Sequence, residues 1–291
     1  MSIPERWRAG TAECPLCSGS SKLHAIVEDV PYFDCGGCDF IFADPRFLDR
    51  VDRGDPVRQY DQDYWATEVL SARTRSFGSS LARVAEAVLY TRVPIERFID
   101  IGTGPGYLLD SLALYLPQNA TRFFGVEKFP PPEEERTRHP NYRCSDLGEL
   151  EESFQCGVCV EVLEHLTPTM ARRLAVSLAK VSVDGSLFLF NTGLTDYVKR
   201  EDPGYLDPYR RGHITCWSVK SARKIFEQSG FRVHQLRGKS WAFVVEYGSN
   251  DGYTPIEDRI WSAPDCNKKL LQDDTMGTVM YILGLESARA Y

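Results

Sequence analysis

Two pairs of cysteines near the N-terminus have the spacing of a metal site. Cys14 and Cys17 form one C-x-x-C pair, Cys35 and Cys38 form the second, and residues 18–34 lie between them. Four thiolates at this spacing are typical of a tetrahedral structural zinc site, which keeps no open position for catalysis. A segment this small buries little apolar surface, so metal binding would supply folding free energy. We therefore expect a zinc ribbon, and the alternative is two unrelated cysteine pairs.

A glycine-rich turn in the middle of the chain is a second candidate site. An apolar run ends in Asp100, Gly102, Gly104 and Gly106 follow at every second position, and an apolar helical pattern begins after them. Glycine lets the backbone turn sharply and lets a ligand approach with no Cβ in the way. Dinucleotide-binding loops have the different spacing G-x-G-x-x-G. The stretch predicts a strand, a ligand-binding loop and a helix, or else a tight turn without a ligand.

Acidic residues also follow the next predicted strands. Glu127 ends the strand 122–127, and ligands of an open α/β sheet bind at the carboxyl ends of its strands. A carboxylate there can accept hydrogen bonds from both hydroxyls of a ribose. Asp146 follows a short strand at 142–144 and is either a ligand contact or a helix N-cap. Glu161 ends the predicted strand 157–161.

Three of these segments resemble motifs of known methyltransferases. The turn after Asp100 resembles the first motif of class I S-adenosylmethionine-dependent methyltransferases. Residues 159–166, Cys-Val-Glu-Val-Leu-Glu-His-Leu, closely resemble the fourth motif of small-molecule methyltransferases of the ubiquinone-biosynthesis type. Residues 213–218 resemble the His-x-x-x-aromatic-Ser/Thr segment of the same families. With the ribbon, residues 91–247 resemble bacterial methyltransferases that act on sugars, glycans or other secondary metabolites.

The resemblance implies S-adenosylmethionine as cofactor. Its methionine end would lie along the glycine turn, its ribose on Glu127, its adenine on Asp146 and Leu147, and Glu161 would form the floor of the pocket. A helix before the glycine turn often covers the cofactor, so residues 64 and 75 are either cofactor or substrate contacts or ordinary surface side chains. The candidate cofactor-binding residues are Asp100, Gly102, Gly104, Gly106, Glu127, Asp146, Leu147, Glu161, Tyr64 and Arg75.

Two histidines fall where a base for methyl transfer is needed. His165 follows the fourth predicted strand and His213 follows the fifth. Methyl transfer to an alcohol requires loss of the hydroxyl proton, and histidine accepts a proton near neutral pH. We expect one of the two to be the base of an O-methyltransferase. The alternatives are a structural hydrogen bond for His165 and support of a helix cap for His213.

Composition limits the function classes. The formal net charge is −7, which gives no general attraction to nucleic acid, so an RNA methyltransferase that uses the ribbon as a clamp is the second choice. C-methylation of a nucleotide-linked sugar and a non-enzymatic scaffold rank lower. The nine cysteines, the polar start of the chain and the lack of a ~20-residue apolar run predict a cytoplasmic protein without a membrane span or signal peptide. The oligomeric state and the methyl acceptor stay open.

The elements that position these residues follow a strand–helix alternation. We predict an α/β fold with a doubly wound, mostly parallel seven-stranded sheet, ending in an antiparallel hairpin, plus the small ribbon. The expected domains are a ribbon at 1–50, a helical connector at 51–90 with one helix from 71 to 90, the cofactor-binding domain at 91–247 and a C-terminal loop and helix at 248–291.

Overall fold

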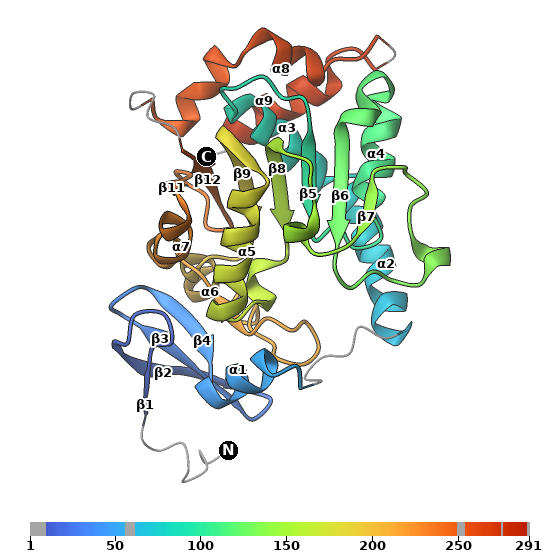
Figure 1. Cartoon of the computed structure of the whole chain (residues 1–291). Coiled ribbons are helices and arrows are strands. Elements are labelled where there is room, and N and C mark those ends of the chain that lie inside the picture. The colour runs from blue at the N-terminus through green and yellow to red at the C-terminus, as the bar shows by residue number, and fades with distance from the viewer. Residues whose placement is uncertain (1–9, 56–61, 249–253, 275, 290–291) are drawn as a thin grey trace.

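The computed structural model describes residues 10–55, 62–248, 254–274 and 276–289, with residues 62–68 described by their backbone alone. Two sheets organise these residues (Figure 1): a five-stranded sheet at the N-terminal end and a seven-stranded sheet in the body of the molecule. The first sheet carries the cysteine pairs, and the second carries the glycine turn.

The seven-stranded sheet has the order β11-β12-β9-β8-β5-β6-β7. From β9 to β7 all neighbours are parallel, whereas β12 lies antiparallel to both β9 and β11. This is the doubly wound, mostly parallel sheet with a terminal hairpin that the sequence predicts. Its strands are β5 (Phe98–Ile101), β6 (Phe123–Glu127), β7 (Tyr142–Cys144), β8 (Phe154–Val160), β9 (Ser182–Asn191), β11 (Phe231–Gln235) and β12 (Ala242–Tyr247).

Helices cover both faces of this sheet, which is why its central strands are continuous apolar runs. One buried cluster joins one face of the sheet to four helices, of which one connects β5 to β6 and the others precede or follow the sheet in the chain, and a second joins the other face to three helices and to the N-terminal sheet. The helices of the first face are α3 (Ser79–Tyr90), α4 (Tyr107–Tyr115), α8 (Asp265–Leu270) and α9 (Val279–Arg289). Those of the second are α5 (Pro168–Lys180), α6 (Thr195–Arg200) and α7 (Val219–Phe226).

The helical connector differs from the single helix expected at 71–90. The structure has two helices, α2 (Gln62–Ser76) and α3, and Gly78 separates them with non-helical backbone angles of −136° and −107°. Glycine lowers helix stability by about 1 kcal/mol relative to alanine, and a change of chain direction is easiest there. The hydrophobic pattern continues across this break, so periodicity alone suggested one helix.

The N-terminal sheet has the order β1-β2-β3-β4-β10. The first four strands form an antiparallel ribbon, and α1 (Pro45–Asp52) follows it, across the boundary expected at residue 50. The fifth strand comes from the main body, because Thr215 pairs with Phe42 and Cys216 with Ile41. The ribbon strands are β1 (Thr11–Glu13), β2 (Ser20–Val27), β3 (Val30–Cys35) and β4 (Phe40–Ala43), and β10 is Thr215–Cys216.

The C-terminal segment packs against the connector. At Gly284 of α9 an added Cβ would lie 2.9 Å from the carbonyl carbon of Ala85 in α3, so the two helix backbones approach closely because position 284 has no side chain. The end of this segment is a helix, as the sequence indicates. Short 3-10 turns connect the remaining elements: η2 (Pro117–Arg122), η3 (Glu133–Glu135), η4 (Leu147–Glu149), η5 (Leu163–His165), η6 (Glu227–Ser229) and η7 (Ile256–Ser262).

Candidate functional site

The glycine turn connects β5 to α4 with three left-handed backbone positions. Gly102, Gly104 and Gly106 have φ angles of 70°, 58° and 81°, values that side chains with a Cβ rarely adopt. An added Cβ at Gly102 would lie 2.5 Å from Cγ2 of Val162, in the segment that follows β8. The turn therefore needs glycine for its backbone shape and for its close contact with the neighbouring loop.

Asp100 lies at the carboxyl end of β5 and is buried. The hydroxyl of Thr103 donates a hydrogen bond of 2.6 Å to its carboxyl group. Burial raises the pKa of Asp100 to about 7, and the nearby charge of Glu127 adds to this effect. The sequence placed Asp100 at the start of the turn, and the structure adds that its buried carboxyl group is hydrogen-bonded to a residue of the turn, Thr103.

Glu127 connects the second strand to the glycine turn. One carboxylate oxygen accepts a 2.9 Å hydrogen bond from the backbone N–H of Gly104, and the other accepts a 2.8 Å bond from the N–H of Phe129. Burial raises its pKa. Each oxygen keeps a second lone pair, so this carboxylate fits a diol such as the ribose hydroxyls without losing these bonds.

Asp146 and Leu147 lie beside the third strand. Asp146 is the N-cap of η4, where its carboxylate accepts from the N–H of Gly148 and the Glu149 side chain completes a capping box. It also forms a 2.8 Å ion pair with Lys128, which lowers its pKa. The helix-cap interpretation is thus present in the structure, while Leu147 is buried. A contact of either residue with adenine stays a prediction.

Glu161 directly follows β8 and has a left-handed backbone with φ of 55°, which is uncommon for a residue with a Cβ. Its carboxylate accepts a 3.1 Å hydrogen bond from the side-chain amide of Asn191, at the end of β9. Of the two connector candidates, Arg75 lies half-buried in the last turn of α2. The side chain of Tyr64 lies outside the described residues.

His165 and His213 come together, although the chain between them is long. Their ring centroids lie 5.0 Å apart. Nδ1 of His165 is 3.0 Å from the carbonyl oxygen of Gly212, and Nδ1 of His213 is 2.8 Å from that of Tyr205. Since a carbonyl only accepts, both rings carry their proton on Nδ1 when neutral, and this tautomer has its lone pair on Nε2.

Glu164 completes this cluster, and the sequence analysis did not select it. The residue is fully buried, and the Nε2 atom of His213 lies 4.0 Å from one carboxylate oxygen. Burial, reinforced by the charge of Glu161, raises its pKa well above the usual range. One ligand-type atom from each of Glu164, His165 and His213 lies within 4.8 Å of the others. The signal was in the sequence, because Glu164 directly precedes His165 in the fourth motif.

The ribbon contacts the His213 segment directly. The buried hydroxyl of Tyr32, in β3, donates a 2.9 Å hydrogen bond to the carbonyl oxygen of His213. The N–H of Ile214 donates to the carbonyl oxygen of Glu164, and the carbonyl of Ile214 accepts from Ala43 in β4. Figure 1 shows the ribbon, in blue, on the side of the large sheet toward which the arrows of β6 and β8 point. No pattern in the sequence pointed to Tyr32.

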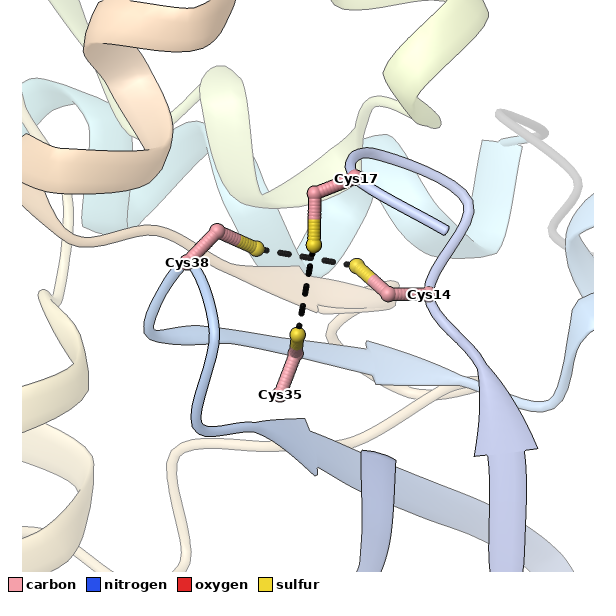
Figure 2. A group of neighbouring side chains, drawn as sticks. All are labelled: Cys14, Cys17, Cys35 and Cys38. Carbon is pink, nitrogen blue, oxygen red and sulfur yellow. Dashed lines mark hydrogen bonds between the residues drawn. The ribbon is translucent and has the colours of Figure 1, made fainter. Parts of the chain in front are cut away.

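The four cysteine sulfurs converge from two turns of the ribbon (Figure 2). The Sγ atoms of Cys14 and Cys38 lie 3.6 Å apart, those of Cys17 and Cys35 lie 3.5 Å apart, and all four lie within 4.8 Å of one another. Disulfide sulfurs would be about 2.0 Å apart. Thiolates around a tetrahedral Zn²⁺ with bonds of about 2.3 Å would be about 3.8 Å apart, so this cluster fits zinc.

The described helices include none that is both long and apolar enough to span a membrane.

Comparison with solved structures finds methyltransferases. The sugar N-methyltransferase KedS8 from Streptoalloteichus sp. is 14% identical, with 62% of this chain and 91% of that chain covered and a TM-score of 0.47. CalS10, an amino pentose methyltransferase from Micromonospora echinaspora solved with S-adenosylmethionine bound, is 16% identical, with 65% and 98% covered and a TM-score of 0.45. The mitomycin 7-O-methyltransferase MmcR is 20% identical, with 58% and 54% covered and a TM-score of 0.42. No curated protein matches the chain.

The sequence profile of a family described as "Methyltransferase domain" matches residues 60–236, from the connector to the terminal hairpin. This range is more than half of the 291 residues and includes the glycine turn, Glu127 and the histidine pair. The chain therefore belongs to the methyltransferase domain family and is an S-adenosylmethionine-dependent methyltransferase.

Proposed function

We propose that this enzyme transfers the methyl group to a hydroxyl of a small molecule, such as a sugar, a glycan or another secondary metabolite. The observation that carries the proposal is the pair His165 and His213, whose rings lie 5.0 Å apart and which are each held through Nδ1 by a backbone carbonyl, so that the basic nitrogen of each neutral ring is Nε2. An alcohol must lose a proton to become an effective methyl acceptor, whereas a neutral amine need not lose one before it attacks.

The residues around the glycine turn are suited to hold the cofactor. When bound, S-adenosylmethionine supplies a methyl group on a positively charged sulfur, which makes that methyl electrophilic. Asp100 and the three glycines would contact the methionine end, and Glu127 would accept hydrogen bonds from the ribose. Asp146 and Leu147 would border the adenine. Glu161 would form the pocket floor, and Tyr64 and Arg75 of α2 would contact cofactor or acceptor.

One histidine of the pair would accept the proton of the acceptor hydroxyl. Both imidazoles have fixed tautomers because their Nδ1–H groups donate to carbonyls, so either Nε2 atom could act as the base. The site would also orient the acceptor oxygen in line with the methyl–sulfur bond, because correct positioning accounts for much of the rate of such a displacement.

The ribbon would bind one Zn²⁺ through Cys14, Cys17, Cys35 and Cys38. Four thiolates fill its coordination shell, so we assign this ion a structural role. By shaping the ribbon, it would hold Tyr32 and β4 against the segment that contains His213.

The experiment combines cofactor binding with an acceptor screen. Isothermal titration with S-adenosylmethionine should show binding that Glu127→Ala weakens at least about ten-fold, while the exposed control Glu151→Ala retains it. Methyl transfer from labelled cofactor is then screened against alcohols, amino sugars and RNA, and we expect products methylated on oxygen.

Two outcomes would contradict the proposal. If His165→Ala and His213→Ala both keep cofactor binding and unchanged turnover, neither histidine is the base. If RNA is methylated with a steep dependence on salt and no small alcohol is, the acceptor class is wrong.

A further inference from the structure

Glu164 is a buried carboxylate without the partners that such a group needs. In the described residues, neither of its carboxylate oxygens has a hydrogen bond of good geometry, and the polar side chains beside it are those of Glu161 and Thr192, which carry no positive charge. Its ion-pair contact in that part of the chain is with His213 at 4.0 Å, and no lysine or arginine is paired with it. Burying an isolated carboxylate costs several kcal/mol or more, so an unpartnered one in a core calls for a cation or a proton. The fold retains it directly beside two histidines.

The two histidines have the orientation that metal ligands have. A histidine that binds a metal through one ring nitrogen usually donates its other N–H to a carbonyl or carboxylate, which fixes the tautomer and the direction of the lone pair. His165 and His213 make such bonds from Nδ1 to Gly212 and Tyr205. The ring of His213 also packs on that of Tyr205, with centroids 4.4 Å apart, so its orientation is fixed by stacking as well.

The backbone around the cluster is held by further bonds. The hydroxyl of Thr215 lies 3.0 Å from the carbonyl oxygen of Leu166, to which it donates, and 3.3 Å from those of Leu163 and Glu164, which are alternative acceptors for the same proton. The indole N–H of Trp217 also donates to Leu163, and Tyr32 supports His213 from the ribbon. The segment after β8 and the segment before β10 therefore form one rigid unit, and only short side-chain movements are needed to bring the ligand atoms together.

We propose that Glu164, His165 and His213 bind a divalent cation through one carboxylate oxygen and the two Nε2 atoms. Two imidazoles and one carboxylate suit cations of intermediate softness such as Mn²⁺, Fe²⁺, Co²⁺ or Zn²⁺ better than Ca²⁺ or Mg²⁺. Ligand atoms that now lie within 4.8 Å would move by roughly 1 Å to reach metal bonds of about 2.1 Å. Three protein ligands leave open positions for an acceptor.

This inference rests on the proposed O-methylation for its chemistry but not for the site itself. An acceptor hydroxyl bound to the cation would lose its proton to water more readily, because the positive charge stabilises the alkoxide. The oxygen then forms the bond to the methyl carbon, and the electron pair of the carbon–sulfur bond leaves with the sulfur as a neutral thioether. In this arrangement the histidines are ligands, so the cation takes over the role that we assigned to an imidazole base.

Binding of Mn²⁺ to the zinc-loaded protein tests the site without a known acceptor. Mn²⁺ prefers oxygen and nitrogen ligands and does not compete for four thiolates, so the ribbon keeps its zinc. The signal of free Mn²⁺ in electron paramagnetic resonance should fall with a one-to-one stoichiometry. Glu164→Gln keeps the shape of the side chain and should weaken binding at least about 100-fold, more than the loss of an outer-sphere contact would.

Two further variants keep the test informative. His165→Gln, at a half-buried position, should also lose Mn²⁺ binding and serves if Glu164→Gln does not fold. His234→Gln is the matched control, because His234 lies 3.0 Å from Glu246 but Arg259 neutralises that carboxylate. It should bind Mn²⁺ as the wild type does. Without Mn²⁺, Glu164→Gln should melt no lower than the wild type, since it replaces a carboxyl group that burial disfavours in its charged form by a neutral group of the same shape.

The inference is overturned if the wild type binds no Mn²⁺ at a one-to-one site, with or without S-adenosylmethionine, or if Glu164→Gln binds it equally well. Glu164 would then be a neutral acid of the core. If the protein methylates an alcohol but does not bind Mn²⁺, the proposed function is kept and the cation site is rejected. If it binds Mn²⁺ but methylates no alcohol, the cation site is kept and the proposed function is rejected.

Discussion

At the scale of single residues, Asp100 and Glu127 place two carboxyl groups at the glycine turn. Both carboxyl groups are largely buried, and neither has an ion-pair partner among the described residues. Glu127 is satisfied by two backbone N–H groups, whereas Asp100 has the Thr103 hydroxyl. A cofactor with a positive charge gains from such a site, because the protein has already met the cost of removing these groups from water.

The cost at Asp100 gives a prediction for pH. The pKa of Asp100 is about 7 in the folded protein, above the value near 3.9 of an unfolded chain. As the pH rises from about 4 to 7, the unfolded state loses this proton first, so the free energy of unfolding falls. Asp100→Asn removes this penalty. We expect the variant to be more stable than the wild type by at most about 4 kcal/mol at pH 8, and by little at pH 4.

Urea unfolding of both proteins at pH 4, 6 and 8 measures the effect. Asp258→Asn, at an exposed position in η7, is the control for loss of a surface carboxylate. A constant difference between Asp100→Asn and the wild type at all three values would mean that folding does not raise the pKa of Asp100. The same variant should bind S-adenosylmethionine more weakly, since it has lost a negative charge at the turn.

At the scale of elements, the turn after β5 and the segment after β8 are built against each other. Gly102 has a left-handed backbone, and a Cβ there would overlap Cγ2 of Val162. We expect Gly102→Ala to lower the free energy of unfolding by about 1–3 kcal/mol, from backbone strain and from the overlap together. Cofactor binding should weaken as well, because the turn would shift.

A double variant separates the two causes. Adding Val162→Ala removes the overlap but not the strain, so it should restore only part of the stability. Gly36→Ala is the matched control, because an added Cβ there meets nothing within 4 Å and its backbone is not left-handed. Full recovery in the double variant would show that the backbone angle of Gly102 costs nothing, and no recovery would show that Val162 is not in contact.

The ribbon acts on the site through β3 and β10. The Tyr32 hydroxyl donates a hydrogen bond to the backbone carbonyl of His213. We therefore expect Tyr32→Phe to reduce kcat several-fold, while the affinity for S-adenosylmethionine stays within about two-fold of the wild-type value. The measurement is methyl transfer to the best acceptor of the screen beside titration with the cofactor. Tyr115→Phe, on α4, should change neither quantity.

A loss of cofactor affinity as large as the loss of kcat would contradict this view of Tyr32, because general loosening of the fold would then explain both. If the pH profile of kcat shifts in Tyr32→Phe but not in Tyr115→Phe, Tyr32 positions His213. General loosening of the fold would not be expected to change the pKa of the reacting group.

At the scale of the whole molecule, the ribbon is not an independent module. One buried cluster includes Phe40 and Phe42 of the ribbon together with Trp217, Phe190 and Phe226 of the main body. The rings of Phe40 and Trp217 lie 4.5 Å apart. Bonds from Lys199 to Asp34 and Asp39 add a polar rim to this contact. Because the two parts share a core, loss of the ribbon would expose apolar surface of the catalytic part.

Removal of the metal tests this coupling. We expect zinc removal by a chelator, or Cys38→Ser, to lower Tm by several degrees and to shift tryptophan fluorescence to longer wavelength, because Trp217 loses its cover. Cys266→Ser, an exposed cysteine outside the cluster, should leave both unchanged. Unchanged fluorescence and Tm after verified metal loss would mean that the ribbon holds its shape through its apolar core alone.

Much of the fold follows from short stretches of the sequence. The cysteine pairs, the glycine turn and the apolar strands were all identifiable, because metal spacing, positive φ angles and burial on both faces depend on residues close together in the chain. The mostly parallel seven-stranded sheet with its terminal hairpin was predicted from the alternation of strand and helix patterns, whereas the order of its strands came from the structure. The break at Gly78 was missed, because one glycine inside a long apolar pattern is a weak signal beside the periodicity around it.

The histidine cluster was only half predicted. The sequence selected His165 and His213 as separate candidates for one role, and it passed over Glu164, which lies next to one of them. Only the fold brings the two rings to 5.0 Å and buries the carboxylate between strands far apart in sequence. Likewise, the bond of Tyr32 to His213 joins residues from opposite parts of the chain.

The sequence by itself determined the family, the mostly parallel sheet, the cysteine cluster and the acidic strand ends, since each is encoded by neighbours along the chain. Tertiary structure alone decided that the ribbon extends its sheet with β10, that α9 packs on α3, and that a buried carboxylate faces two oriented imidazoles. These features depend on contacts between residues that are far apart in the sequence. Such contacts form only when the elements pack together, and no short stretch of the sequence encodes them.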